Sequence, residues 1–185
     1  MTRTPTPTTA IPAARQRHVR NTAPYENWRP PLVGVSILAP VETSHILVAE
    51  LRGDLLVPSG PVHNGQPPEQ AAQKVLRGVP SGVPVLRRVA VDWVQMRRRQ
   101  ICTYVLATKR LTHDDAARYT YCDGRADLWM LPIAQAISAL PGLARARVLA
   151  GLKALADEEM AYLEAGIVSR TESARLTCSR LLRGQ

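Results

Sequence analysis

Short β-rich segments separated by proline- and glycine-rich turns fill most of residues 32–107. Branched apolar runs or strict alternation between turn residues are typical of strands, and such patterns occur in five segments: 32–38, 45–50, 55–57, 83–95 and 101–107. Apolar residues at helical spacing occur in three segments: 69–77, 133–140 and 143–164. Strands, one short central helix, more strands and C-terminal helices predict an α+β fold with helices packed against a mixed β-sheet.

Local signals set the expected ends of the helices. Pro80 stops the central helix early, because proline cannot continue a helix. Thr112 is a candidate N-cap for a short helix or loop over 112–118. Gly166 is expected to end the last helix.

The charge excess lies at the two ends of the chain. The chain has 24 Lys and Arg against 15 Asp and Glu, a net charge of +9. Residues 1–25 hold four arginines and no acid, and residues 165–185 hold four arginines and one acid. We therefore expect three parts: a disordered basic tail over 1–30, a folded domain over 31–166, and a basic C-terminal tail over 167–185, in which residues 169–183 could form a helix.

No signal peptide and no disulfide pattern is visible in the sequence. The Arg- and Thr-rich, acid-poor start also resembles an organelle transit peptide, although a flexible tail is the favoured interpretation. No apolar run is long enough to span a membrane, and no apolar stretch follows the first basic residues as in a signal peptide. The three cysteines, Cys102, Cys122 and Cys178, are too scattered for a disulfide framework. These features predict a cytoplasmic protein without a membrane span.

The segment 58–82 reads PSGPVHNGQPPEQAAQKVLRGVPSG. Glycines at 60 and 65 precede a Pro-Glu-x-Ala-Ala helix start at 68–72, and a base and an aliphatic residue follow at Lys74 and Leu76. This segment resembles the box of the Nudix superfamily, in which a glycine, five residues, a glutamate and seven residues precede Arg-Glu-U-x-Glu-Glu-x-Gly-U, where U is bulky and aliphatic. The flanking segments 89–93 and 128–132 resemble the strand after the box and the strand-to-helix step before the last helix.

The resemblance covers about residues 32–164 and implies a Nudix-like α/β/α sandwich around a mixed β-sheet. In Nudix hydrolases, glutamates of the box bind Mg²⁺, which binds the diphosphate and activates water. The positions that match those ligands hold Val75, Gly78 and Val79. Since Mg²⁺ prefers oxygen ligands and these side chains have none, we expect no metal site and no cofactor.

Two further box positions also differ from the family pattern. Gln66 replaces the carboxylate that steadies the box arginine, and Lys74 replaces that arginine. Glu69 is the one carboxylate left in the box, at the start of the helix instead of at a ligand position. The favoured interpretation is a Nudix-fold protein that does not hydrolyse its ligand and acts as a binding, regulatory protein.

A pocket is expected between the box loop at 60–66, the turn at Arg97 and the loop around Asp123. Without carboxylates it should be neutral to basic and bind an anionic, diphosphate-containing ligand, or a protein partner, without metal. Six residues are the ligand-binding candidates: Gly60, His63, Gln66, Lys74, Arg97 and Arg99. The alternative for the arginines is a solvated turn. Trp93 and Trp129 are expected to pack in the core, the alternative being stacking against a base or an isoprenoid.

A divergent, Mg²⁺-dependent diphosphate hydrolase is the alternative function, and magnesium enters only here. Its weak catalytic candidates are Glu69, His63, Asp123 and Asp127. Acids at Asp92 and 157–159 are further ligand candidates, against the simpler expectation of exposed or turn-forming acids.

A second alternative is an adaptor that binds nucleic acid or another anionic partner through the basic tails. It predicts strongly salt-dependent binding that is lost when the tails are deleted. Nudix-fold proteins often dimerise, so a homodimer stays open.

Overall fold

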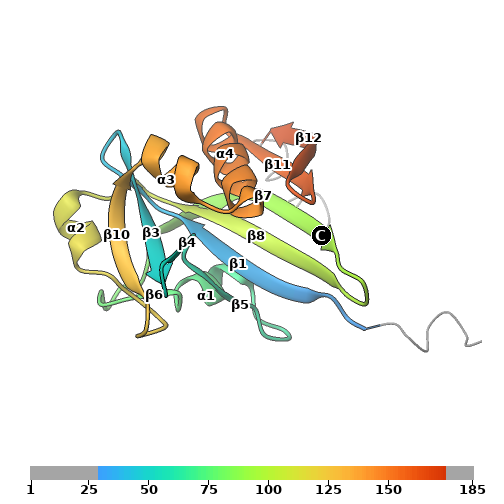
Figure 1. The fold of residues 1–185 in the computed structure, drawn as a ribbon, viewed down its shortest axis with the longest axis horizontal. Coiled ribbons are helices and arrows are strands. Elements are labelled where there is room, and N and C mark those ends of the chain that lie inside the picture. The colour runs from blue at the N-terminus through green and yellow to red at the C-terminus, as the bar shows by residue number, and fades with distance from the viewer. Residues whose placement is uncertain (1–28, 174–185) are drawn as a thin grey trace, which may run out of the picture.

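The computed structural model describes residues 29–173. A six-stranded sheet in the order β12-β11-β7-β8-β1-β5 forms its centre (Figure 1). Its strands are β1 (Leu32–Leu38), β5 (Ser59–Pro61), β7 (Val85–Gln95), β8 (Gln100–Thr108), β11 (Glu159–Glu164) and β12 (Ile167–Ser173). The sheet is mixed, because β1 runs parallel to β8 and β11 runs parallel to β7, whereas the other neighbours are antiparallel.

Smaller sheets and four helices complete the fold of residues 29–173. A second sheet in the order β10-β3-β2, with β4 paired to β3, consists of β2 (Pro40–Val41), β3 (His45–Leu51), β4 (Asp54–Leu56) and β10 (Asp127–Pro132). A two-stranded ribbon joins β6 (Leu76–Arg77) to β9 (Thr120–Tyr121). The helices are α1 (Pro68–Ala72), α2 (His113–Ala117), α3 (Ile133–Ala139) and α4 (Gly142–Ala156).

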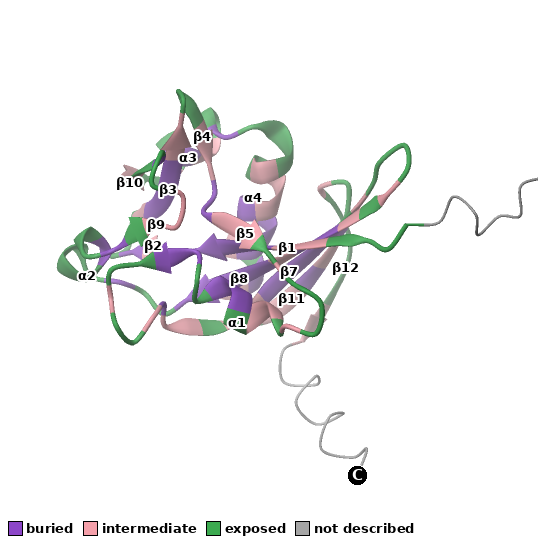
Figure 2. Ribbon diagram, turned by 90° about the horizontal axis from the view of Figure 1, so that it is seen from below, coloured by how far each residue is buried: buried purple, intermediate pink, exposed green. Residues whose placement is uncertain are grey.

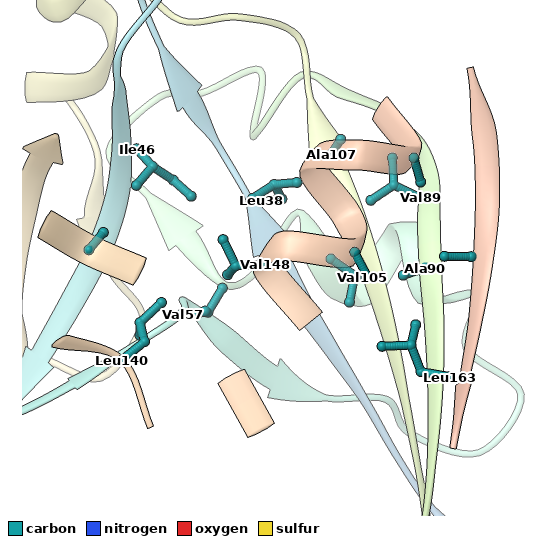
Figure 3. Close-up of a cluster of buried hydrophobic side chains, with 14 of the residues drawn as sticks. Leu38, Ile46, Val57, Val89, Ala90, Val105, Ala107, Leu140, Val148 and Leu163 are labelled. Atoms are coloured by element: carbon teal, nitrogen blue, oxygen red, sulfur yellow. The ribbon is translucent and has the colours of Figure 1, made fainter. Parts of the chain in front are cut away.

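Two apolar clusters cover the two faces of the large sheet. On one face α4 packs on Leu38, Val89 and Val105, which lie close together in Figure 3. Gly151 lets α4 approach this closely, because a Cβ there would lie 3.1 Å from Leu38 and 3.3 Å from Val89. On the other face α1 and the box segment cover a second cluster that includes Val35 and Leu106. Figure 2 shows that the strands are buried between exposed loops. With helices on both faces of the sheet, the fold has the expected α/β/α arrangement.

Buried polar contacts fix α4 to the sheet. Asp92 on β7 is fully buried, accepts a 2.7 Å hydrogen bond from Arg147 Nε on α4, and accepts a second from the Gly166 amide at 3.0 Å. Arg87, also on β7, donates to the carbonyl oxygens of Ala154, in the last turn of α4, and of Glu159, at the start of β11. The bond to Ala154 satisfies a carbonyl group that a helix leaves without a partner at its C-terminus.

The five expected strands and the helix at 133–140 are confirmed to within a few residues. Thr112 is the N-cap of α2, with its hydroxyl accepting from the Asp115 amide. The helix expected over 143–164 is wrong after Ala156: Glu158 takes a positive φ of 55°, and residues 159–164 form β11 beside β7. The apolar residues Met160 and Leu163, which suggested a helical stripe, belong to strand β11, and Leu163 packs in the cluster beneath α4.

The expected helix in the C-terminal tail is wrong for residues 169–173, which belong to β12 and carry the domain past the expected boundary at 166. The rest of that tail, and residues 1–28, lie outside the described residues. Within 29–173, no helix is long and apolar enough to cross a membrane.

Candidate functional site

The box segment forms a short helix and then turns away into a strand. Pro67 and Pro68 begin α1, which ends at Ala72 instead of continuing to residue 77. The chain then enters β6, where Leu76 pairs with Tyr121 and Arg77 with Thr120. The expected helix over 69–77 is therefore wrong in its second half, because residues 76 and 77 pair with β9 as a strand.

The three positions that match Nudix magnesium ligands do not fit a metal ion. Val75 is 2% exposed and packs against Gly60, where an added Cβ would lie 2.9 Å from its Cγ2. Gly78 has a φ of +103°, and a Cβ there would lie 2.1 Å from the carbonyl oxygen of Arg118. Val79 packs against the second apolar cluster. Among the described residues, no group of three or more His, Cys, Asp or Glu side chains could hold a metal ion.

Glu69 is engaged in an ion pair. Its two carboxylate oxygens accept hydrogen bonds from Nε and Nη2 of Arg88 on β7, and the Arg88 guanidinium also lies 5.0 Å from the ring centre of Tyr104. The hydrogen bond from Arg88 lowers the pKa of Glu69, against the opposing effect of burial. Glu69 therefore fastens α1 to the sheet. Because both of its oxygens accept hydrogen bonds from Arg88, it is not a free catalytic carboxylate.

The other acidic candidates are paired with arginines or exposed. Asp92 is buried beneath α4 with Arg147. Asp123 accepts two hydrogen bonds from the Arg125 guanidinium and one from the Arg125 amide, which lower its pKa to about 2. Asp127 is exposed at the start of β10, opposite Glu50 of β3. Of the acids at 157–159, the first two lie in the turn between α4 and β11 and the third begins β11, so none lies on the exposed side of a helix.

His63 and Gln66 close the loop before α1. The His63 amide donates to Gln66 Oε1 at 3.3 Å, and the Gln66 amide donates to the His63 carbonyl at 3.0 Å. Gly65, with a φ of +75°, makes the turn between them. Gly60 pairs with Val35 inside the sheet. These three candidates therefore shape the loop and the sheet edge.

Two pockets lie beside the β6–β9 ribbon. The first, which we call the basic pocket, has a volume of about 430 Å³ and is lined by residues 73, 74 and 76–82. Lys74, Arg77 and Ser81 are polar members of this lining, which holds no acid. The second, the aromatic pocket, has a volume of about 620 Å³ and is lined by residues 119–121, 124 and 126–129.

The pockets differ from the one expected at the sequence level. Lys74 lines the basic pocket, whereas Gly60, His63, Gln66, Arg97 and Arg99 line neither pocket. Arg97 and Arg99 lie in the turn between β7 and β8. The prediction that both tryptophans pack in the core is wrong. Trp93 is 37% exposed, and Trp129, which lines the aromatic pocket, is 49% exposed.

Sequence reasoning missed several pocket residues. Arg77 follows Leu76 at a position that the box pattern leaves unspecified, and Tyr119 and Tyr121 precede the Asp-Gly turn that drew attention to Asp123. The alternation of Tyr119 and Tyr121 was a usable signal, because alternate residues of a strand share one face.

No protein-family profile and no curated protein sequence matches the chain. Solved structures do. The solution structure of the E. coli ORF135 protein has a TM-score of 0.52 and 14% identity, over 69% of this chain and 91% of that chain. The crystal structure of a NUDIX hydrolase from Nitrosomonas europaea has a TM-score of 0.51 and 13% identity, over 74% of this chain and 80% of that chain. Together with the order of strands and helices around the box segment, these similarities show that the chain has a Nudix-like fold.

Proposed function

We propose that this protein binds an anionic, diphosphate-containing ligand in the basic pocket without metal and without hydrolysing it. The observation that carries the proposal is the lining of that pocket. Lys74 and Arg77 lie there beside Gly78, at the part of the chain where Nudix hydrolases carry carboxylates, and no acidic side chain faces them.

The charge of the pocket favours direct binding of an anion. A site built from carboxylates needs a cation to cancel its charge before it can hold a diphosphate. Here both cationic groups lack an ion-pair partner among residues 29–173, so they are available to phosphate oxygens. Arginine suits this role because its guanidinium can donate two parallel hydrogen bonds to one phosphate.

The hydrolase alternative has weaker support in the described residues. Of its acidic candidates, Glu69, Asp92 and Asp123 each accept hydrogen bonds from an arginine. Asp127 lines the aromatic pocket, but among the described residues it is not part of a group of three or more His, Cys, Asp or Glu side chains that could hold a metal ion. Attack on phosphorus by a metal-activated water needs a set of ligands that holds the metal, and residues 29–173 do not offer one.

Calorimetry with inorganic pyrophosphate as the probe, in buffer containing EDTA, tests the proposal. We expect binding without metal, weakened about tenfold by each of Lys74→Gln and Arg77→Gln, as for the loss of one charge-assisted hydrogen bond at a partly exposed site. A matched variant, Lys109→Gln with Arg110→Gln, removes two exposed charges outside the pocket and should change binding little.

A panel of a nucleotide sugar, a dinucleotide and an isoprenoid diphosphate, each with and without Mg²⁺, then separates the functions. Unchanged substrate after binding supports a binding protein. Release of phosphate products only when Mg²⁺ is present would contradict the proposal and direct the search to Asp127. Equal loss of affinity in the pocket variant and in the matched variant would mean that general charge, and not this pocket, attracts the anion.

A further inference from the structure

One end of the large sheet combines exposed apolar side chains with unpaired arginines. At this end β1 begins, β7 turns into β8, and β11 turns into β12, as the register Leu32↔Ile101 and Glu164↔Trp93 shows. We call it the tip, defined by Leu32, Trp93, residues 96–99 and residues 164–168. Figure 1 shows the β7–β8 hairpin reaching beyond α4 where the chain enters β1.

The exposed apolar residues of the described chain gather at the tip. Nine large hydrophobic side chains are exposed, and five of them belong to the tip: Leu32, Trp93, Met96, Ile167 and Val168. Met96 is 52% exposed and Ile167 is 74% exposed. Because neighbouring strands lie about 4.8 Å apart, the row from β12 to β1 spans roughly 19 Å. Several exposed apolar side chains at one end of a sheet mark an interaction site more often than scattered single residues do.

The charge of the tip is positive. Arg97, Arg98 and Arg99 fill the turn between β7 and β8, and none of them has an ion-pair partner among residues 29–173. Glu164, exposed beside Trp93, is the acid that the strand register brings to this end. In addition, residues 1–25, which carry four arginines and no acid, precede the strand that begins at the tip.

From this combination we propose that the tip docks on the surface of an anionic lipid bilayer. Tryptophan is enriched at the level of lipid headgroups, and aliphatic side chains gain free energy below it. Arginines in the same turn can extend their guanidinium groups to lipid phosphates while their stems stay in the apolar layer. A nucleic acid would use the arginines and the indole, but it would leave Met96, Ile167 and Leu32 without a role. This docking is independent of the ligand proposed for the basic pocket.

Flotation of the full chain with vesicles tests the proposal. We expect binding to vesicles of phosphatidylcholine with phosphatidylglycerol, and little binding to phosphatidylcholine alone. Arg97→Gln, Arg98→Gln and Arg99→Gln together should weaken binding by about a hundredfold, at about fivefold for each arginine. The matched triple variant Arg52→Gln, Lys109→Gln and Arg110→Gln removes the same charge from exposed positions outside the tip and should stay within about threefold of the native chain.

Insertion is measured separately from charge attraction. In a chain with Trp28→Phe and Trp129→Phe, the remaining indole is Trp93, and brominated lipids should quench its fluorescence on binding. Met96→Ser, which leaves the charge unchanged, should weaken binding and reduce the quenching. Equal weakening in the two triple variants, or binding without quenching of Trp93, would overturn the proposal. Tip-dependent binding of single-stranded oligonucleotides without vesicle binding would assign the tip to nucleic acid instead.

Discussion

The two faces of the large sheet are held in different ways. On the face of α4, a fifteen-residue helix packs through Gly151 onto buried strands, and Asp92, Arg147 and Arg87 satisfy polar groups beneath it. On the box face, the five-residue helix α1 adds Ala71 and Ala72 to the second apolar cluster, and its polar link to the sheet is one partly exposed ion pair, Glu69 to Arg88. The two faces thus differ in their polar contacts, which are buried beneath α4 and partly exposed at α1.

The contacts described beneath α4 do not involve residues 75, 78 and 79, the three positions at which the box segment resembles the magnesium-binding pattern of the Nudix family. Of these positions, Val75 adds to the second core cluster and Gly78 supplies a backbone turn. Consequently, the box segment serves here as a wall of the basic pocket and as part of the core. Four predictions test the contrast between the two faces.

The largest effect is expected beneath α4. Asp92→Ala leaves the Arg147 guanidinium partly buried without its partner and removes the acceptor of the Gly166 amide. We expect the free energy of unfolding to fall by about 3–5 kcal/mol, the range for breaking a buried ion pair from one side. Urea denaturation followed by circular dichroism measures it.

The double variant Asp92→Leu with Arg147→Met is its control. Replacing both partners by apolar side chains removes the unpaired charge, so much of the lost stability should return. If Asp92→Ala is as stable as the native chain, the buried polar contacts do not hold α4 to the sheet, and the comparison fails.

The second effect concerns the turn at Gly78, which follows β6. Gly78→Ala places a Cβ 2.1 Å from the Arg118 carbonyl oxygen at a φ of +103°, so the turn must shift. We expect a loss of about 3 kcal/mol, from the left-handed backbone and the steric overlap together. Thermal unfolding measures the change.

Gly53→Ala is a matched control for that variant. Its φ is +88°, but no atom lies within 4 Å of the added Cβ, so only the backbone cost of about 1 kcal/mol applies. Equal losses at the two positions would mean that the turn at Gly78 is not constrained by Arg118.

Because any side chain at residue 78 meets the Arg118 carbonyl oxygen, Gly78→Glu should not create a magnesium site. Calorimetry with Mg²⁺ checks this.

The sequence predicts this architecture better than it predicts the site. Alternation between turn residues located the strands, because each strand needs only local apolar residues and flanking turns. The end of α1 could not be located in this way, since pairing of Leu76 with Tyr121 joins residues far apart in the chain. The same holds for Glu69 and Asp92, whose arginine partners come from β7 and α4. Their roles depend on contacts between elements, and local spacing does not encode such contacts.

A smaller effect is expected at the ion pair of α1. Both side chains are more than one-third exposed, at 41% for Glu69 and 38% for Arg88, so solvent screens the pair and Glu69→Gln should cost about 0.5–1 kcal/mol. Because the folded pKa of Glu69 is lowered from its ordinary value of 4.5, the contribution is present above pH 4.5 and is lost as the pH falls through the folded pKa. Urea denaturation at neutral pH and at lower pH values measures this.

Arg88→Gln supplies the control for that pair. The native chain and the Glu69→Gln variant should converge in stability at low pH, and Glu69→Gln should have almost no effect in an Arg88→Gln background. A difference that stays constant with pH would show that packing of Glu69, and not its charge, holds α1 to the sheet.

The smallest effect is expected at Asp123, whose ion pair with Arg125 is partly exposed. Hydrogen bonds from the Arg125 guanidinium and amide lower the pKa of Asp123 to about 2. In Arg125→Gln we expect the pKa to rise toward its ordinary value of 3.8, because the guanidinium contribution is lost while the amide bond stays. Carboxyl carbon shifts followed by NMR against pH measure it. An unchanged pKa of Asp123 in Arg125→Gln would leave its carboxylate available for another role, and Asp123 would return as a candidate beside Asp127 in the hydrolase alternative.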